Sequence, residues 1–376
     1  MADHVCESRA AARPHAPRTR SPRLAGAGLT WVVIAAIQPV WGADFMFRAE
    51  VDGQTVEGSP LAWSESSVSL LTRDGSLIDL DPQQVSGATK TAPRFQGYPA
   101  TEVAPRLRDE FGSGYDVASS THFLVVYPRG DRRDWAARFE ALYRSLTRYA
   151  AVRDFPVSDP AYPLVAIVYP SEAAYYTAIQ QMGISLPSGM LGHYDPQTNR
   201  VYLFDPGDDW EQPGGSAATI IHEATHQAAF NVGLHTRFAE APRWLTEGLA
   251  TLFEARGVWA PRTGDRPKDR YNRGRLADYR RYAKEDGPPM PIGALVASDD
   301  AFKSQPLAAY AQAWALTFYL SETRPRQYAQ YLQTTANRPN FASYDPRSRL
   351  NDFKAAFGDD LRLLDANFAS WMKSLE

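Results

Sequence analysis

The strongest constraint on the fold is a short polar motif inside an apolar stretch of the chain. Residues 222–226 read His-Glu-Ala-Thr-His, with Ser-Ala-Ala-Thr-Ile-Ile before them and Gln-Ala-Ala-Phe after them. These flanks are apolar and compatible with a helix. Positions i and i+4 of a helix lie on the same face. The sequence therefore predicts a helix over about 215–231 that presents His222 and His226 side by side.

This spacing is suited to metal chemistry. Two imidazoles on one helix face can bind one ion, and Glu223 can hold and deprotonate a water molecule beside it. Zinc lowers the pKa of a bound water from about 15.7 to roughly 7. We therefore expect His222 and His226 as metal ligands, Glu223 as catalytic base and Zn²⁺ as cofactor. The alternative is a helix with two ordinary histidines and an ordinary glutamate.

Cysteine usage narrows the kind of metal site. The chain has a single cysteine, Cys6, so neither a disulfide framework nor a thiolate metal site can be built. Histidine and carboxylate ligands favour a catalytic zinc over a structural one, because structural zinc sites are usually rich in thiolates. A catalytic zinc needs a third protein ligand and keeps one position open.

The third ligand must come from downstream of the motif. The metzincin pattern would require glycine at 229 and histidine at 232, but the chain has Ala229 and Val232, which excludes that class. His235 lies in a predicted loop. Glu247 lies in Arg-Trp-Leu-Thr-Glu-Gly-Leu-Ala, residues 243–250, on a predicted helix that runs from Pro242 to about 256.

We expect Glu247 to be the third ligand. Gly248 and Ala250 are small enough to let its helix approach the metal helix closely, where Ala224 and Ala228 are small as well. The alternatives are His235 as ligand, or Glu247 as a solvated carboxylate on a helix face.

The two motifs together resemble a known family. His-Glu-Ala-Thr-His, then twenty residues, then the glutamate of Trp-Leu-Thr-Glu-Gly-Leu-Ala resembles the gluzincin zinc metallopeptidases of the peptidase MA clan. The nearest form is similar to the peptidase-MA-like proteins of unassigned function, in which WLxEGxA follows HExxH. The resemblance covers about 121–375. It implies an α+β fold, with a mixed sheet over the active-site helix and then a helical half, as in thermolysin-like enzymes.

The resemblance also implies a substrate position and a further catalytic residue. In such proteins the strand before the metal helix often forms the edge of the cleft and binds extended substrate. Here that strand is 200–205, so the expected partner is a peptide or protein laid along it. Tyr310, which opens Tyr-Ala-Gln-Ala-Trp-Ala-Leu-Thr-Phe-Tyr-Leu, resembles the catalytic tyrosine that stabilises the oxyanion. The alternative is a core aromatic stripe, and His193 is a weaker candidate donor.

The sequence departs from the family pattern at two points. Thermolysin-like enzymes carry an Asp four residues after the ligand Glu, where this chain has Thr251. A zinc-bound histidine normally needs an acceptor for its other ring nitrogen, so we expect Glu254 or a backbone carbonyl instead. A recognition loop of the GAMEN kind is absent from the sequence, so exopeptidase action is not supported.

Five segments follow one another along the chain. Residues 1–43 carry five arginines before an uncharged run at 24–37, which predicts a secretory signal cut after Gly42 or Ala43 and export to the periplasm or outside the cell. The alternative is an uncleaved N-terminal anchor, the one membrane contact we expect. Residues 44–90 predict a small all-β barrel or meander with two Asp-Gly turns, and 91–118 a linker. Residues 119–257 predict the sheet-bearing half with both metal motifs, and 258–376 a helical half.

Three functions are compatible with these patterns. The first is an endopeptidase that uses water activated by Glu223 on zinc. The second is an inactive or non-peptidase metal-binding adaptor that acts through the β module, against which the intact motif argues. The third is a hydrolase of cell-wall or other amide bonds. A nucleic-acid partner is not expected, because the formal net charge is −3 and the basic residues beyond the N-terminus are scattered.

Overall fold

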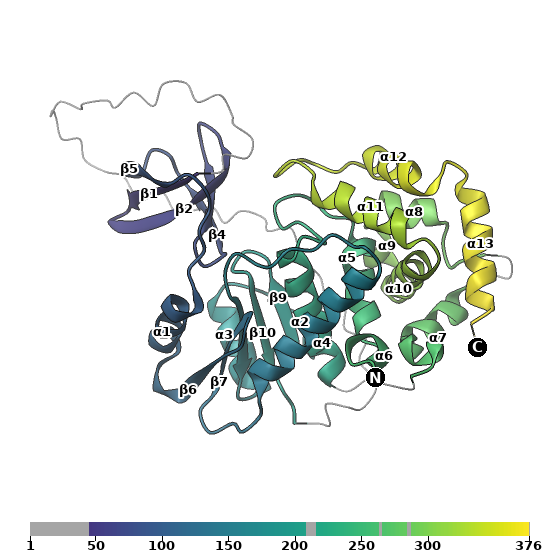
Figure 1. Cartoon of the computed structure of the whole chain (residues 1–376), viewed down its shortest axis with the longest axis horizontal. Helices are drawn as coiled ribbons and strands as arrows, with labels where there is room; N and C mark the ends of the chain where they lie inside the picture. The colour runs from purple at the N-terminus through teal and green to yellow at the C-terminus, as the bar shows by residue number, and fades with distance from the viewer. Residues whose placement is uncertain (1–44, 208–215, 263–264, 284–286, 376) are drawn as a thin grey trace.

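The structure, a computed structural model, describes residues 45–207, 216–262, 265–283 and 287–375. It is an α+β protein with an N-terminal sheet, a second sheet covered by helices, and a helical C-terminal half (Figure 1). The signal or anchor predicted at 1–43 lies outside the described residues. Among the helices within those residues, none has the length and apolar character needed to cross a membrane.

The N-terminal module is an antiparallel sheet with strand order β4-β3-β2-β1-β5. Its first turn, Asp52-Gly53, has φ angles of 51° and 78°, the two positive values that a tight hairpin favours. Its small core is apolar and holds Phe47, Ala49, Val68, Leu70 and Leu80. The strands are β1 (Met46–Val51), β2 (Gln54–Trp63), β3 (Val68–Thr72), β4 (Leu77–Leu80) and β5 (Val85–Ala92).

The segment 91–118 is not an irregular linker, as its prolines and glycines suggested. It forms helix α1 (Ala100–Phe111), a short 3₁₀ turn (Gly112–Gly114) and the first strand of the second sheet, β6 (Tyr115–Ser119). Pro99 and Gly112 lie at the two ends of α1, where such residues are well tolerated. Pro105 lies on the exposed face, where water can satisfy the carbonyl that loses its partner.

The second sheet has strand order β6-β7-β8-β10-β9. β8 pairs in parallel with β7 and β10, while β6 and β9 are antiparallel strands at the two edges. Alternate side chains pack against α1 and α3 on one face and against α2 and α4 on the other. The bounds are β7 (Phe123–Pro128), α2 (Trp135–Val152), β8 (Leu164–Tyr169), α3 (Glu172–Gln181), β9 (Gly192–Asp195), β10 (Arg200–Phe204) and α4 (Ser216–Asn231).

This strand order corrects the expected position of the substrate strand. Residues 200–205 were expected at the edge of the cleft, but β10 is paired on both sides and its main-chain groups are used within the sheet. The edge strand is β9 (Gly192–Asp195), its hairpin partner. Sheet order depends on pairing between distant segments, so the hairpin alone did not show which of its strands lies outside.

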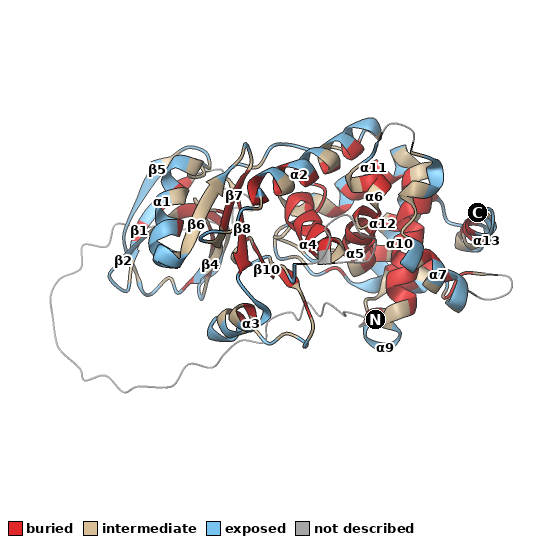
Figure 2. Cartoon of the chain, turned by 90° about the horizontal axis from the view of Figure 1, so that it is seen from below, coloured by how far each residue is buried: buried red, intermediate tan, exposed pale blue. Residues whose placement is uncertain are grey.

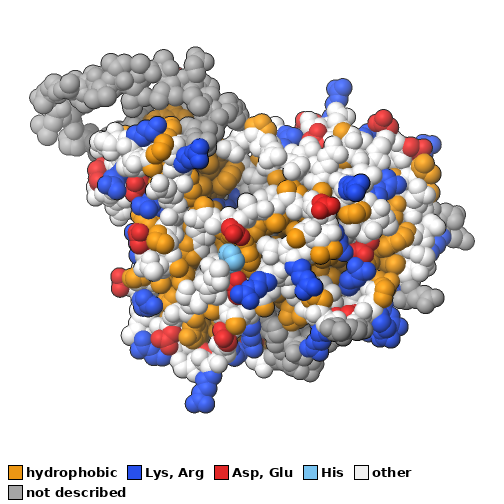
Figure 3. All heavy atoms as spheres, in the orientation of Figure 1, with side chains coloured by type: hydrophobic (Ala, Val, Ile, Leu, Met, Phe, Trp, Pro, Cys, Tyr) orange, Lys and Arg blue, Asp and Glu red, His pale blue; other side chains and the backbone are white. Residues whose placement is uncertain are grey.

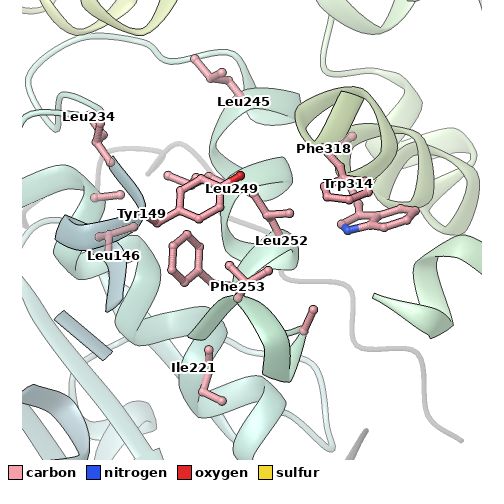
Figure 4. Packing of buried hydrophobic residues seen from close by; sticks show 14 of the residues in the cluster. Leu146, Tyr149, Ile221, Leu234, Leu245, Leu249, Leu252, Phe253, Trp314 and Phe318 are labelled. Carbon is pink, nitrogen blue, oxygen red and sulfur yellow. The ribbon is translucent and has the colours of Figure 1, made fainter. Parts of the chain in front are cut away.

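The helical half is built around one central helix, α10, in which every residue from Ala308 to Ser321 is buried (Figure 2). It packs against α5, and side chains of α2, α4, α5 and α10 meet in one core (Figure 4). The helices are α5 (Arg243–Phe253), α6 (Arg256–Trp259), a 3₁₀ turn (Pro267–Arg270), α7 (Arg273–Tyr282), α8 (Ile292–Ala297), α9 (Ala301–Ser304), α10 (Pro306–Thr323), α11 (Pro325–Ala336), α12 (Pro346–Phe357) and α13 (Leu361–Lys373).

Gly248 is required at the contact between α5 and α10. A Cβ atom there would lie 2.1 Å from Thr317 Oγ1 and 2.7 Å from the Ala313 carbonyl oxygen. The glycine therefore permits a close approach, but the neighbour is α10 and not the metal helix α4, as the sequence had suggested.

The β module docks on the turn that follows the edge strand β9. The Leu77 amide donates to the Gln197 carbonyl oxygen at 2.7 Å, and the Gln197 side chain donates back to Leu77. One guanidinium reinforces this junction, because Arg237 donates to the carbonyl oxygens of Pro196 and Gly75 at 2.9 and 2.8 Å. The module is thereby held against the second sheet.

Candidate metal centre

Helix α4 places its two histidines as the spacing predicted. His222 and His226 lie one turn apart, and their Nε2 atoms are 3.1 Å from each other. Both side chains are buried, with exposed fractions of 7% and 8%. On the same helix, Ile220, Ile221 and Ala224 pack into the main core. The core thus holds the helix in the rotation that brings both imidazoles together.

Helix α5 adds a carboxylate to this pair. Glu247 Oε2 lies 3.2 Å from His222 Nε2 and 3.6 Å from His226 Nε2, and the residue is 4% exposed. Zinc bonds of about 2.0–2.1 Å in tetrahedral geometry separate two ligand atoms by about 3.3–3.4 Å. The three distances between these atoms, 3.1, 3.2 and 3.6 Å, bracket that value. The residues therefore fit a zinc ion, and together they form a group capable of binding a metal.

A second carboxylate orients His222. The His222 Nδ1 atom lies 2.9 Å from Glu254 Oε1, so of the two acceptors expected in place of the missing aspartate the structure has Glu254. Thr251 instead donates its hydroxyl to the Glu247 carbonyl oxygen at 2.7 Å, within its own helix. A carboxylate on Nδ1 favours the tautomer that leaves Nε2 to face the metal-binding group.

The ionisable groups of this cluster shift one another's pKa values. For these side chains by themselves, burial would lower the pKa of His222, but hydrogen bonds to Glu247 and Glu254 outweigh it and raise that pKa to about 10. Burial would raise the pKa of Glu247, yet hydrogen bonds from the two histidines hold it well below its usual range. The cluster therefore keeps Glu247 anionic, which is the state in which a carboxylate can bind a metal ion.

Glu223 lies between the metal helix and the edge strand. Its Oε2 atom accepts a hydrogen bond from the Tyr194 amide of β9 at 2.8 Å. Burial raises the pKa of the Glu223 carboxyl above its usual value, although the two histidines and the Tyr194 amide oppose that effect. The sequence could not reveal this contact, because its donor is a main-chain group whose direction depends on strand pairing.

Tyr310 reaches the ligand set through an arginine. Arg243 donates from Nη2 to the Tyr310 hydroxyl at 3.0 Å, and its Nε atom lies 3.5 Å from Glu247 Oε1. Tyr310 is buried and its ring meets Phe302 edge-on at 5.2 Å. Arg243 was not among the site residues expected from the sequence, although its position four residues before Glu247 places both on one face of α5.

Of the other histidines that the structure describes, none joins the cluster. His193 lies on the opposite face of the sheet, stacked on Tyr202 at 5.2 Å and bonded to the Tyr175 hydroxyl at 2.9 Å, so the weaker oxyanion candidate is wrong. Side chains alternate along a strand, and its neighbour Tyr194 faces α4 instead. His235 is buried against Phe230. Among the described residues, neither of its ring nitrogens has a hydrogen-bond partner.

Comparison with known proteins gives one family and distant structural likenesses. A family model described as "Protein of unknown function (DUF1570)" matches residues 216–342, which contain both α4 and α5. No curated protein matches the chain. Solved structures similar to the chain include two of a mutant M1 zinc metallopeptidase from Deinococcus radiodurans, the second bound to a Tyr-Ser-Ala substrate.

These structural likenesses are partial. Identities are 14% and 17%, both TM-scores are 0.38, and the matches cover 69% and 70% of this chain. They cover 52% of each of the two solved chains, so the present chain spans about half of their length.

Proposed function

We propose that the chain is a zinc-dependent metallopeptidase that hydrolyses peptide bonds as an endopeptidase. The observation that carries this proposal is the convergence of three buried ligand atoms, all within 4.8 Å of one another, beside a glutamate held at a sheet edge. His222, His226 and Glu247 would hold the zinc. Bound there, zinc would polarise the scissile carbonyl group and lower the pKa of a bound water.

Glu223 is the proposed general base. It is next to the first ligand in sequence and is not itself one of the three converging groups. Burial raises its pKa, which makes its carboxylate a better proton acceptor. The Tyr194 amide holds one carboxylate oxygen toward the edge strand, where a substrate backbone would lie.

The substrate strand belongs on β9 rather than on β10. In the antiparallel pair, main-chain groups point alternately toward the partner strand and away from it. The Tyr194 amide points away from β10, because it donates to Glu223. Gly192, two residues earlier, has the same direction. An extended peptide that adds to this edge would lie beside the proposed base.

Tyr310 is the proposed donor to the oxyanion. Arg243 contacts both the Tyr310 hydroxyl and Glu247 Oε1, at 3.0 and 3.5 Å, which links Tyr310 to the proposed ligand set. Export of the protein, with cleavage after Gly42 or Ala43 or retention as an anchor, belongs to the same proposal and depends on the composition of residues 1–43.

Glu223→Gln tests the proposal. Glutamine keeps the shape and loses the base, and general base catalysis contributes typically ~10²–10⁴-fold. Cleavage of a mixed peptide library should fall by that range while zinc content stays unchanged. Glu172→Gln, at an exposed position on α3, is the matched control. Full activity of Glu223→Gln would contradict the mechanism. Zinc binding by a wild-type protein that cleaves neither peptides nor cell-wall amides would favour the adaptor.

A further inference from the structure

Asn272 makes an unusual set of contacts at the start of α7. Its Oδ1 atom accepts a hydrogen bond from the Arg275 amide at 3.1 Å, which caps the helix. Its Nδ2 atom donates to the Thr251 carbonyl oxygen at 2.9 Å and to Glu254 Oε2 at 2.7 Å. One amide group therefore joins the first turn of α7, the last turn of α5 and a carboxylate beside the metal-binding residues.

Glu254 needs such support. It is the C-cap residue of α5, and helix ends are held less firmly than helix interiors. Its Oε1 atom binds His222 Nδ1 at 2.9 Å, while Asn272 binds the other oxygen. The orientation of the imidazole thus depends on the carboxylate, and the carboxylate is held from the other side by the Asn272 amide.

We propose that Asn272 is a positioning residue for the metal centre, acting on His222 through Glu254. This inference depends on the proposed function, because it takes His222 to be a metal ligand. Serine and aspartate cap a helix about as well as asparagine. Neither can replace it here, because serine is too short to make both further contacts and aspartate cannot donate. Asn272 therefore has a role that helix capping does not explain.

The test is a double-mutant cycle on zinc affinity. Asn272→Ser keeps a good cap and removes both Nδ2 contacts. Loss of an outer-shell partner typically costs about 10–100-fold in metal affinity, and we expect Asn272→Ser and Glu254→Ala each to fall in that range. Residues that act through one path are not additive. In the Glu254→Ala background, Asn272→Ser should therefore have little further effect.

Two further measurements separate positioning from folding. Asp345→Ser exchanges the cap of α12, outside the contacts that link Asn272 to His222, and should leave zinc affinity unchanged. The visible absorption of the Co²⁺-substituted protein should change in Asn272→Ser and not in Asp345→Ser. If Asn272→Ser does not fold, Asn272→Asp, which keeps cap and shape, provides the same comparison.

The outcomes are distinct. The inference would be overturned if both Asn272 variants bound zinc as tightly as Asp345→Ser. It would also be overturned if the losses of zinc affinity in Asn272→Ser and Glu254→Ala added fully in the double variant. Wild-type protein that binds no zinc would instead overturn the proposed function itself.

Discussion

The β module and the α4–α5 helix pair bury very different side chains. The module has a core of five apolar residues, and the buried polar side chain among its described residues is Ser59. The helix pair buries His222, Glu223, His226 and Glu247, all less than 9% exposed. Buried ions cost several kcal/mol each unless they are well paired. An apolar core explains the module by folding alone, whereas folding alone does not require the four ionisable side chains that the helix pair buries and pairs.

The two regions also differ in their contacts, although charges of both signs are mixed on the face of the molecule drawn in Figure 3. The module meets the second sheet at the turn after β9 through main-chain groups and Arg237, while the ionisable cluster lies inside the body. The comparison predicts that changes to the helix pair alter metal binding and catalysis, and that changes to the module junction alter docking alone.

The largest effect is expected at the third ligand. Glu247→Ala removes the carboxylate 3.2 Å from His222 Nε2 and should abolish zinc retention. His235→Ala should retain zinc, because His235 is not in the metal-binding group. Elemental analysis after gel filtration without chelator compares the two variants. The reverse result, with zinc lost only in His235→Ala, would show that His235 is the third ligand.

The next effect concerns the proposed oxyanion donor. Tyr310→Phe should lower turnover on the order of 10²–10³-fold, the loss expected for one donor, and should leave zinc content unchanged. Tyr331→Phe, at another buried tyrosine of the helical half, is the control. Steady-state rates on a responsive peptide measure both. Equal rates in the two variants would assign Tyr310 to the aromatic core.

A smaller effect follows from pH. Burial lowers the pKa of His193 from 6.5 to about 4, although Asp195 opposes it. Between these values the folded state binds fewer protons than the unfolded state, so stability is complete above pH 6.5 and falls as pH decreases toward 4. At about 1.4 kcal/mol per pH unit, the loss is about 3 kcal/mol. Denaturant unfolding of wild type and His193→Gln measures it, and identical acid slopes would contradict the assignment.

The smallest effect is expected at the module junction. Arg237→Ala removes hydrogen bonds to Pro196, Gly75 and the Tyr162 hydroxyl, each with a net value of about 0.5–1.5 kcal/mol. Proteolysis between the module and the body should become faster, while zinc content stays the same. Arg129→Ala, at an exposed ion pair, is the control. Loss of zinc in Arg237→Ala would show that the module supports the metal centre directly.

Local patterns predicted some parts of the molecule well. The helix predicted around His222 corresponds to α4, and the helix predicted around Glu247 corresponds to α5. Both predictions succeeded because spacing along a helix determines which side chains share a face. Glu254 was one of two acceptors considered, and the structure selects it. These features depend on residues close in sequence or on one specific pair of motifs.

Features that depend on distant segments could not be predicted. The positions of β10 and β9 depend on pairing with β8, and the neighbour of Gly248 depends on how α10 crosses α5. The prolines and glycines of 91–118 suggested a linker where the structure has α1, whose buried Val103 and Leu107 pack on the sheet. A truncation at the expected boundary between residues 118 and 119 would remove most of β6 and expose the next strand.

Zinc stoichiometry tests the central claim most directly. Protein comprising residues 44–376, purified without chelator, should contain about one zinc per chain, because two histidines and one carboxylate complete a catalytic set. The same measurement on Glu223→Gln should give the same value, since Glu223 is not one of the three converging groups. Folded wild-type protein that holds no transition metal, even after zinc is supplied, would contradict the account.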